Sequence, residues 1–250
     1  MNDTLALAIV LVPALVLAIV FHEVAHGYAA LLLGDPTARE RRRLSLNPLR
    51  HVDALGTIVI PGMLALLRLP VFGWAKPVPV DKWRLRNPRF GMMAVAAAGP
   101  GTNLVLAGVA AAILGLLANL LTPDAADAGR FLDLLRAIAF QGVMPAGLGI
   151  AGLLLSGLYF FVLINIFLAL FNLLPIPPFD GSHIVEGLLP PAAARAYARL
   201  RPLGFTIVFL LILVAPYLFP GFDLIGRFVI PPVEWAEEHY FALARFFAGA

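Results

Sequence analysis

Residues 5–33 read LALAIVLVPALVLAIVFHEVAHGYAALLL, an apolar stretch interrupted by three ionisable side chains. A helix that crosses a bilayer needs roughly 20 mostly apolar residues, so this stretch is long enough to span one. The three ionisable residues are His22, Glu23 and His26. Ionisable groups inside a membrane helix are costly and, by default, functional. This one segment therefore predicts both a membrane protein and the place of its functional site.

The composition of the whole chain indicates the same class. Of its 250 residues, 61% are hydrophobic and only 13% are charged, and the mean hydropathy is +0.90. Soluble domains are about 45–50% apolar and about 25% charged, so a soluble enzyme is excluded. The absence of Cys excludes disulfides and cysteine-ligated metal sites. We expect an all-α polytopic protein of the cell membrane, with four to six helices.

Three further stretches are long and apolar enough to span a bilayer, namely residues 92–121, 149–174 and 203–219. Residues 55–72 are apolar but are broken by prolines, which favours a re-entrant or β-hairpin element around 55–80. Residues 131–148 are mixed in polarity and indicate an interfacial segment. Residues 233–248 show an amphipathic pattern that suits a membrane surface.

Basic residues predict the orientation of these helices. Residues 39–50, 76–89 and 195–201 hold 13 of the 18 Lys and Arg residues. If residues 55–72 enter and leave on one face, all three basic loops lie on one side, which the positive-inside rule makes cytoplasmic. Residues 122–129 contain two Asp but no Lys or Arg, as expected for the opposite side. The net charge of +3 is therefore an orientation signal, and we expect no nucleic-acid partner.

HEVAH, at residues 22–26, has the H-E-x-x-H spacing of a zinc-binding helix. Two His four residues apart share one helix face and can bind the same Zn²⁺ ion. Glu23 can then reach the open position of the metal and act as a general base on bound water. The alternative is a polar cluster between helices, or a histidine pair in a proton pathway.

A catalytic zinc site needs a third protein ligand. Asp180 follows NLLPIPPF at residues 172–179, whose prolines end the helix and leave extended chain. By the charge count this end lies on the same side as His22 and His26, so Asp180 is the best third ligand.

Three other residues keep both functional and purely structural interpretations. His51 and Asp53 either orient a zinc ligand or gate water entry, or they form a plain turn. His183 is an alternate ligand or a proton relay, or else a surface residue on the following helix.

Three separated motifs resemble the site-2 protease family, the intramembrane zinc metalloproteases. They are HEVAHG at 22–27, GPGTN at 99–103 and NLLPIPPFDG at 172–181. LNPLRHVD at 46–53 and GWAKPVPV at 73–80 are similar to the short prokaryotic branch of the family. The resemblance covers residues 10–190 and implies a three-helix catalytic core with extra helices. The family usually has Leu before the Asp-Gly pair, whereas Phe179 stands here.

The resemblance implies a set of roles for these residues. His22, His26 and Asp180 would bind one zinc ion per chain, and Glu23 would be the general base. The substrate would be a transmembrane segment of another protein, cut within the bilayer. The count of basic residues predicts that the active site lies towards the cytoplasmic side.

Two weaker sets of residues keep alternatives open. Asn103 and Asn172 are amides in apolar spans, so each either contacts the oxyanion or substrate backbone or bonds between helices. Lys76, Pro77 and Val78 lie in an extended segment. The resemblance suggests that this segment receives a substrate strand by β-addition; the alternative is a juxtamembrane anchor.

We expect a single membrane-embedded domain over residues 1–250, with a catalytic core over 5–190 and accessory C-terminal helices over 191–250. Only about 30 residues separate the middle spans, too few for a peptide-binding insert, since folded domains have at least about 50. No soluble C-terminal regulatory domain is expected, and hence no nucleotide partner. Two other classes stay open: a metal or proton transporter using the same His/Asp cluster, and a non-catalytic membrane scaffold.

Overall fold

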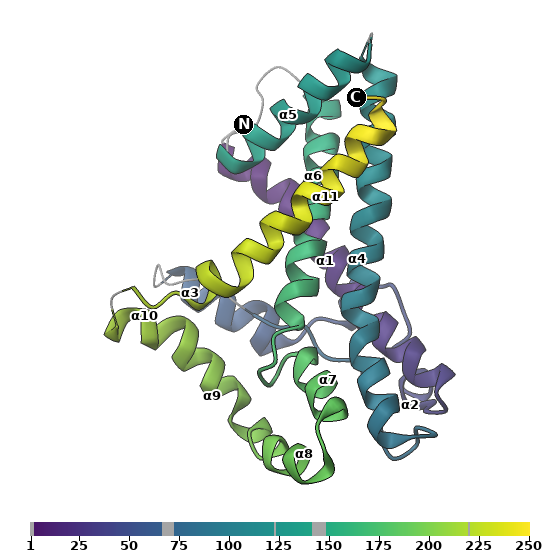
Figure 1. Cartoon of the computed structure of the whole chain (residues 1–250), viewed down its shortest axis with the longest axis vertical. Helices are drawn as coiled ribbons and strands as arrows, with labels where there is room; N and C mark the ends of the chain where they lie inside the picture. Colours follow the sequence, from purple (N-terminus) through teal and green to yellow (C-terminus); the bar gives the residue numbers. More distant parts are fainter. Residues whose placement is uncertain (1–2, 67–72, 123, 142–148, 220) are drawn as a thin grey trace. The chain divides into compact units, whose positions relative to one another are not determined.

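The computed structural model describes residues 3–66, 73–122, 124–141, 149–219 and 221–250 (Figure 1). These residues form helices and irregular chain without strands, so the expected all-α class is confirmed. The α-helices are α1 (Asp3–Leu32), α2 (Thr37–Glu40), α3 (Ile60–Leu66), α4 (Pro88–Leu121), α5 (Ala125–Gln141), α6 (Gly149–Asn172), α7 (Asp180–Leu188), α8 (Pro191–Ala198), α9 (Gly204–Phe209), α10 (Ala215–Leu218) and α11 (Ile230–Ala248). Short 3₁₀ segments are η1 (Pro48–Arg50) and η3 (Arg201–Leu203), and π-helical segments are η2 (Ala54–Val59), η4 (Leu210–Val214) and η5 (Ile225–Val229).

Four helical stretches of the described chain are long and apolar enough to cross a membrane. They are Ala8–Leu32, Pro88–Leu121, Ala151–Asn172 and Pro191–Leu218. Helices satisfy their own backbone hydrogen bonds, which is why apolar spans adopt them in lipid. All four spans expected from the sequence are found, and the protein is a multi-pass membrane protein. The last one is built from several consecutive helical pieces, from α8 to α10.

The segment expected to be re-entrant or a β-hairpin is helical where it is described. Helices η2 and α3 occupy Ala54–Leu66, and residues 73–80 are irregular chain without strand pairing. Residues 67–72, where a hairpin turn would fall, lie outside the described residues. The Asp53 carboxylate accepts hydrogen bonds from the N–H groups of Leu55 and Gly56, which caps the start of η2. This cap gives the segment a helical rather than a strand-like beginning.

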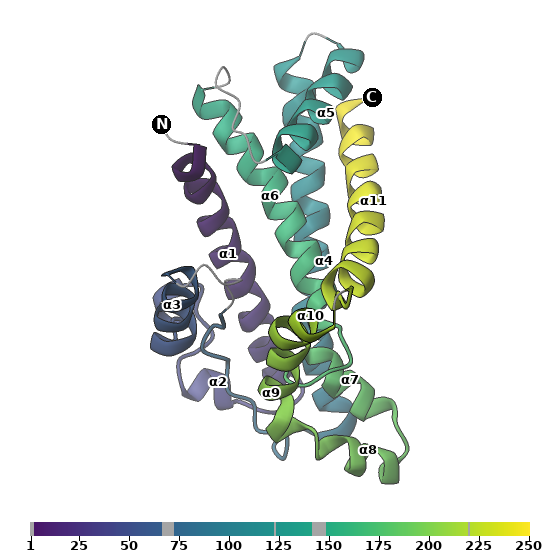
Figure 2. The same ribbon diagram turned by 90° about the vertical axis from the view of Figure 1, so that its left-hand side faces the viewer.

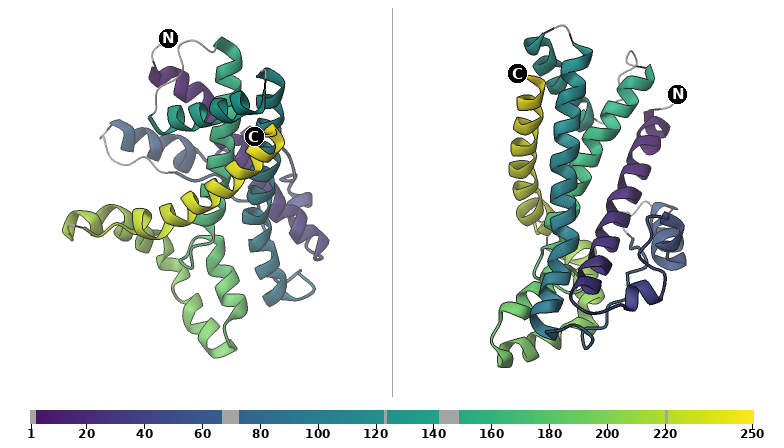
Figure 3. Two further views of the ribbon diagram at one scale, coloured as in Figure 1. Left: turned by 45° about the horizontal axis from the view of Figure 1, so that its top comes forward. Right: turned by 90° about the vertical axis from the view of Figure 1, so that its right-hand side faces the viewer.

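The chain divides into two compact units. Unit 1 comprises Met1–Ala18, Asn103–Leu170 and Val229–Ala250, and unit 2 comprises Ile19–Thr102 and Phe171–Phe228. Within unit 1, α11 runs alongside α4 (Figures 2 and 3). Gly115 of α4 makes this possible, because a Cβ there would lie 2.0 Å from the Ala244 carbonyl oxygen.

Helix α11 differs from the membrane-surface helix that its amphipathic sequence predicts. Its face bearing Ala236, Phe241 and Ala244 is buried in the apolar core of unit 1. Glu237 is only 2% exposed, and it accepts hydrogen bonds from Arg136 and from the Tyr159 hydroxyl. A buried carboxylate needs such partners, because an unpaired charge in an apolar core is very costly. The apolar face of this helix therefore packs on protein rather than on lipid.

The segment expected to be interfacial, residues 131–148, is described only as far as Gln141. It belongs to α5, where Leu132 and Leu135 are buried in the core of unit 1. Mixed polarity here reflects one face in the core and one exposed face. Residues 142–148 lie outside the described chain.

Within unit 2, local signals in the sequence end α1 and begin α4. Gly34 follows α1 with a left-handed φ of 108°, a conformation that glycine adopts without steric cost. Asn87 precedes α4, and its side chain accepts from the N–H groups of Arg89 and Phe90. Pro88 at the first helical position suits this cap. The ends of these two helices, each of which carries part of the site, are thus encoded locally.

Candidate metal centre

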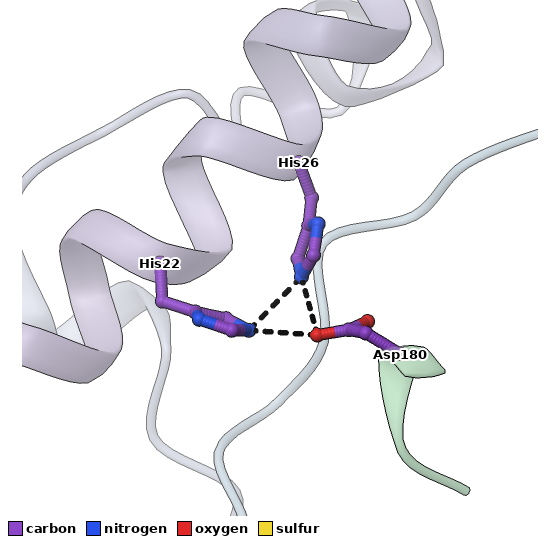
Figure 4. A group of neighbouring side chains, drawn as sticks. All are labelled: His22, His26 and Asp180. Carbon is purple, nitrogen blue, oxygen red and sulfur yellow. Dashed lines mark hydrogen bonds and ion pairs between the residues drawn. The ribbon is translucent and has the colours of Figure 1, made fainter. Parts of the chain in front are cut away.

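Three side chains from two distant parts of unit 2 converge on one point (Figure 4). His22 and His26 lie one turn apart on α1, and Asp180 is the first residue of α7. The Nε2 atoms of the two histidines are 3.0 Å apart. Asp180 Oδ2 lies 3.0 Å from His22 Nε2 and 3.3 Å from His26 Nε2. The structure therefore brings together the three residues that the sequence singles out as metal ligands.

A backbone carbonyl sets the orientation of the His26 ring. His26 Nδ1 donates to the Val95 carbonyl oxygen of α4, with 2.7 Å between them. Because a carbonyl only accepts, the Nδ1 position carries a proton, and the neutral ring then has its lone pair on Nε2. This is the arrangement that metal-binding histidines commonly have. The Nε2 atom faces the other two side chains, as a ligand atom should.

Asp180 comes directly after the proline-rich segment at residues 172–179, and its side chain is ionised. Burial would raise the pKa of this carboxyl, but hydrogen bonds with His22 and His26 outweigh burial and lower the pKa to about 2. Asp180 is thus a carboxylate at neutral pH. Gly181 lets the chain turn closely here, because a Cβ at this position would lie 2.2 Å from the Leu173 carbonyl oxygen.

The donor set fits a zinc ion. Zinc takes imidazole nitrogen and carboxylate oxygen at about 2.0–2.1 Å, which for a tetrahedral ion places ligand atoms roughly 3.3 Å apart. The three measured separations, 3.0, 3.0 and 3.3 Å, are close to that spacing. Three protein ligands also leave one tetrahedral position open, as in catalytic rather than structural zinc sites.

Gly99 of α4 is part of the site, although it has no side chain. A Cβ built on Gly99 would lie 2.5 Å from His26 Cε1 and 2.6 Å from His22 Nε2. No Cβ tolerates contacts that short, so the two rings occupy their positions only because residue 99 is glycine. The GPGTN motif marked this region in the sequence, but only the structure shows the contact with the histidines. The Val95 carbonyl has no signal in the sequence at all.

We expect Gly99→Ala to lose most cleavage activity and much of its zinc. The added methyl group has to displace one or both imidazoles, and a misplacement of about 1 Å in a site costs roughly a hundredfold in rate. Zinc content and cleavage rate, measured on the same purified sample, test this. Gly101→Ala is the matched control, because a Cβ there meets no atom within 4 Å. Equal zinc content and activity in the two variants would contradict the role of Gly99.

Asn103 is buried in unit 1 and bonded to another helix. Its Nδ2 donates to Asn165 Oδ1 at 2.6 Å and to the Ala18 carbonyl oxygen at 3.3 Å. These contacts favour bonding between helices over a role at the oxyanion. Asn165 is fully buried, and no motif in the sequence marks it. Asn172, the last residue of α6, is partly buried in unit 2.

The other candidate residues have contacts within unit 2 that explain their positions. His51 is buried and donates from Nε2 to the Ser45 carbonyl oxygen, and Asp53 caps η2. These contacts favour turn-forming roles. His183 accepts from Arg201 Nη2 at 3.1 Å. Burial and the nearby Arg201 guanidinium lower the pKa of His183.

Residues 76–78 lie beside α1. The Val78 N–H donates to Glu23 Oε2 at 2.8 Å, and the Lys76 N–H donates to the His51 carbonyl oxygen. The Lys76 and Pro77 carbonyl oxygens accept from the Arg43 guanidinium. The Lys76 and Val78 N–H groups and the Lys76 and Pro77 carbonyl oxygens are therefore bonded within the chain, and a role of this segment in strand addition stays a prediction.

A zinc metalloprotease of the membrane is the class that three features indicate: apolar helices of spanning length, a His-His-Asp cluster, and a glutamate next to the first histidine. The model of peptidase family M50 matches residues 10–215. The chain belongs to this family, the site-2 proteases, as the three motifs indicated.

Two relatives named as zinc metalloproteases cover most of the chain. "Putative zinc metalloprotease YwhC" of Bacillus subtilis (strain 168) is 34% identical over 223 residues, which are 89% of this chain and 84% of that protein. "Putative zinc metalloprotease Rip2" of Mycolicibacterium smegmatis is 27% identical over 82% of this chain and 67% of its own length. No solved structure matches the chain.

Proposed function

We propose that the chain is an intramembrane endopeptidase that cleaves transmembrane segments of other membrane proteins. The convergence of His22, His26 and Asp180 carries the proposal. His22 and His26 lie within a helical stretch, Ala8–Leu32, that is long and apolar enough to cross a bilayer. A hydrolytic site on such a helix acts at membrane depth, where only membrane segments of other proteins are in reach.

The three ligands hold one zinc ion per chain in this proposal. When bound, zinc lowers the pKa of a coordinated water to about 7 and polarises the carbonyl of the scissile bond. The Glu23 carboxylate takes a proton from the attacking water and delivers it to the leaving amide nitrogen. A helical substrate hides its carbonyls in its own hydrogen bonds, so the segment has to unwind locally before cleavage.

The positive-inside count supports a cytoplasmic location for the site. The basic loops at 39–50 and 76–89 belong to unit 2, which also contains the His-His-Asp cluster. Positively charged loops are retained on the cytoplasmic side during insertion. The protein would thus cut its substrates near the cytoplasmic face of the cell membrane.

The proposal also treats residues 1–250 as a single membrane-embedded domain.

Metal removal should abolish the activity reversibly. Treatment with a zinc chelator is expected to stop cleavage of a tagged transmembrane peptide in detergent or liposomes, because water loses its activation. One equivalent of Zn²⁺ should restore it, and elemental analysis should find one zinc per chain. A protein that transports zinc or protons across liposomes but leaves the peptide intact in every metal state would instead support the transporter alternative.

A further inference from the structure

Glu23 is held by an amide that lies 55 residues further along the chain. The Val78 N–H donates to Glu23 Oε2 at 2.8 Å, and the Val78 side chain is only 7% exposed. Pro77 and Pro79 flank this donor, and proline has no N–H. Val78 therefore has the single amide hydrogen within residues 77–79, and that hydrogen is directed at Glu23.

The chain before Val78 is fixed by contacts from two other loops. We call residues 76–81 the strap. The Lys76 N–H donates to the His51 carbonyl oxygen at 2.8 Å. Arg43 donates from Nη2 to the Lys76 carbonyl oxygen at 2.6 Å, and its Nη1 donates to the Arg50 carbonyl oxygen. A guanidinium offers several donors in a rigid fork, so Arg43 joins the strap to the loop around Arg50.

The chain after Val78 is fixed as well. The Asp81 N–H donates to Asp35 Oδ2 at 2.6 Å, and Asp35 is fully buried. Hydrogen bonds to a carboxylate are stronger than neutral ones. Gly27, one turn after Glu23, lets the strap lie against α1, because a Cβ there would lie 2.9 Å from Val78 Cγ1. Both ends of the strap and its middle are thus anchored within unit 2.

We propose that the strap positions the general base of this enzyme. Ordering a free Glu side chain costs rotamer entropy, and the charge-assisted bond from Val78 offsets that cost in advance. Arg43 is then a positioning residue, which acts on Glu23 through the strap without touching it. This inference rests on the proposed function, because it takes Glu23 as the base.

Hydrogen exchange at the Val78 amide tests the contact without relying on activity. In the zinc-loaded protein, Glu23→Ala removes the acceptor, and Val78 exchange should become about tenfold faster or more, since a bond to a charged group is lost. Glu23→Gln keeps an acceptor oxygen, so Val78 should stay protected. Unchanged exchange in Glu23→Ala would overturn the proposal.

Kinetics of Arg43 variants test the positioning role. Arg43→Ala is expected to lower kcat about tenfold with unchanged KM and zinc content, because the base is misplaced rather than the substrate or metal site. Arg43→Lys should retain part of the rate. Arg41→Ala, which removes the same charge from an exposed position nearby, should behave as the wild type. If Arg41→Ala lowers kcat as much as Arg43→Ala does, or if Arg43→Ala changes KM alone, the proposal is overturned. Arg43 would then act through its positive charge, by attracting the substrate.

The two proposals fail differently. If Glu23→Gln cleaves at the wild-type rate, Glu23 is not the base and the proposed mechanism fails, whatever the exchange of Val78. If Glu23→Gln is inactive while Val78 exchanges equally in all variants, the mechanism stands and the strap has no role in holding the base.

Discussion

Glu23→Gln is expected to remain folded and zinc-loaded and to lose about a thousandfold in cleavage rate, since general acid–base groups contribute roughly 10²–10⁴-fold. The substitution keeps the size of the side chain and an oxygen that can still accept from Val78. It removes the basic carboxylate that takes the proton from water. The proposed metal ligands His22, His26 and Asp180 are untouched, so zinc should remain bound.

Single-turnover cleavage of a labelled transmembrane peptide, with zinc content determined on the same sample, measures this effect. Glu40→Gln is the matched control, because Glu40 is exposed and pairs with Arg84 at the surface. Exposed ion pairs contribute little to stability, so this variant should cleave normally. Full turnover by Glu23→Gln would refute the proposed mechanism.

Asp180→Asn is expected to lose zinc and activity together. Removing a group that merely supports a metal ligand costs about 10–100-fold in affinity, so replacing a ligand itself should weaken binding by at least about a hundredfold. Asn has nearly the shape of Asp but lacks the negative charge that lies 3.0 Å from His22 Nε2. Asp180→Asn should lose both zinc and activity, whereas Glu23→Gln should lose activity and keep its zinc. The two variants together therefore separate catalysis from metal binding.

Competition with a chelator of known affinity measures the zinc affinity of Asp180→Asn. Asp133→Asn is the control, since it removes an exposed carboxylate that pairs with Arg245 in unit 1. Wild-type zinc affinity in Asp180→Asn would mean that another residue completes the site. His183, three residues further along, would then be the candidate to replace next.

Features with local causes could be predicted from the sequence. Apolar runs of sufficient length predicted all four spanning stretches, because a helix in lipid satisfies its own backbone groups whatever its neighbours are. The spacing of His22 and His26 places both rings on one face of α1, since residues four apart are neighbours on any helix. Asp180 was predicted from the prolines before it, from the charge count that places it on the same side as the histidines, and from its place in the motif at 172–181.

Features that depend on distant contacts could not be predicted. The amphipathic pattern of α11 is the same for a helix on lipid and a helix on protein. The buried face of α11 and the bond of Glu237 to Arg136 show that this helix packs on protein. Asn103 fits an oxyanion role as well as an interhelical one until Asn165 is found beside it. The helical start at Ala54 depends on a cap from Asp53, whereas the prolines that follow suggested a broken element.

Hydropathy, helix periodicity and ligand chemistry were enough to predict the helical membrane class, the four spans and the three proposed metal ligands from the sequence. The space that Gly99 leaves for the two imidazoles and the hydrogen bond from the Val78 amide to Glu23 became known only from the folded chain. Both contacts join segments more than 50 residues apart, and in each the decisive group is a backbone atom or a missing side chain. Almost every residue has a backbone N–H, and a glycine has no side chain that could indicate a contact. A pattern of residues therefore cannot show which of these positions come together in the fold.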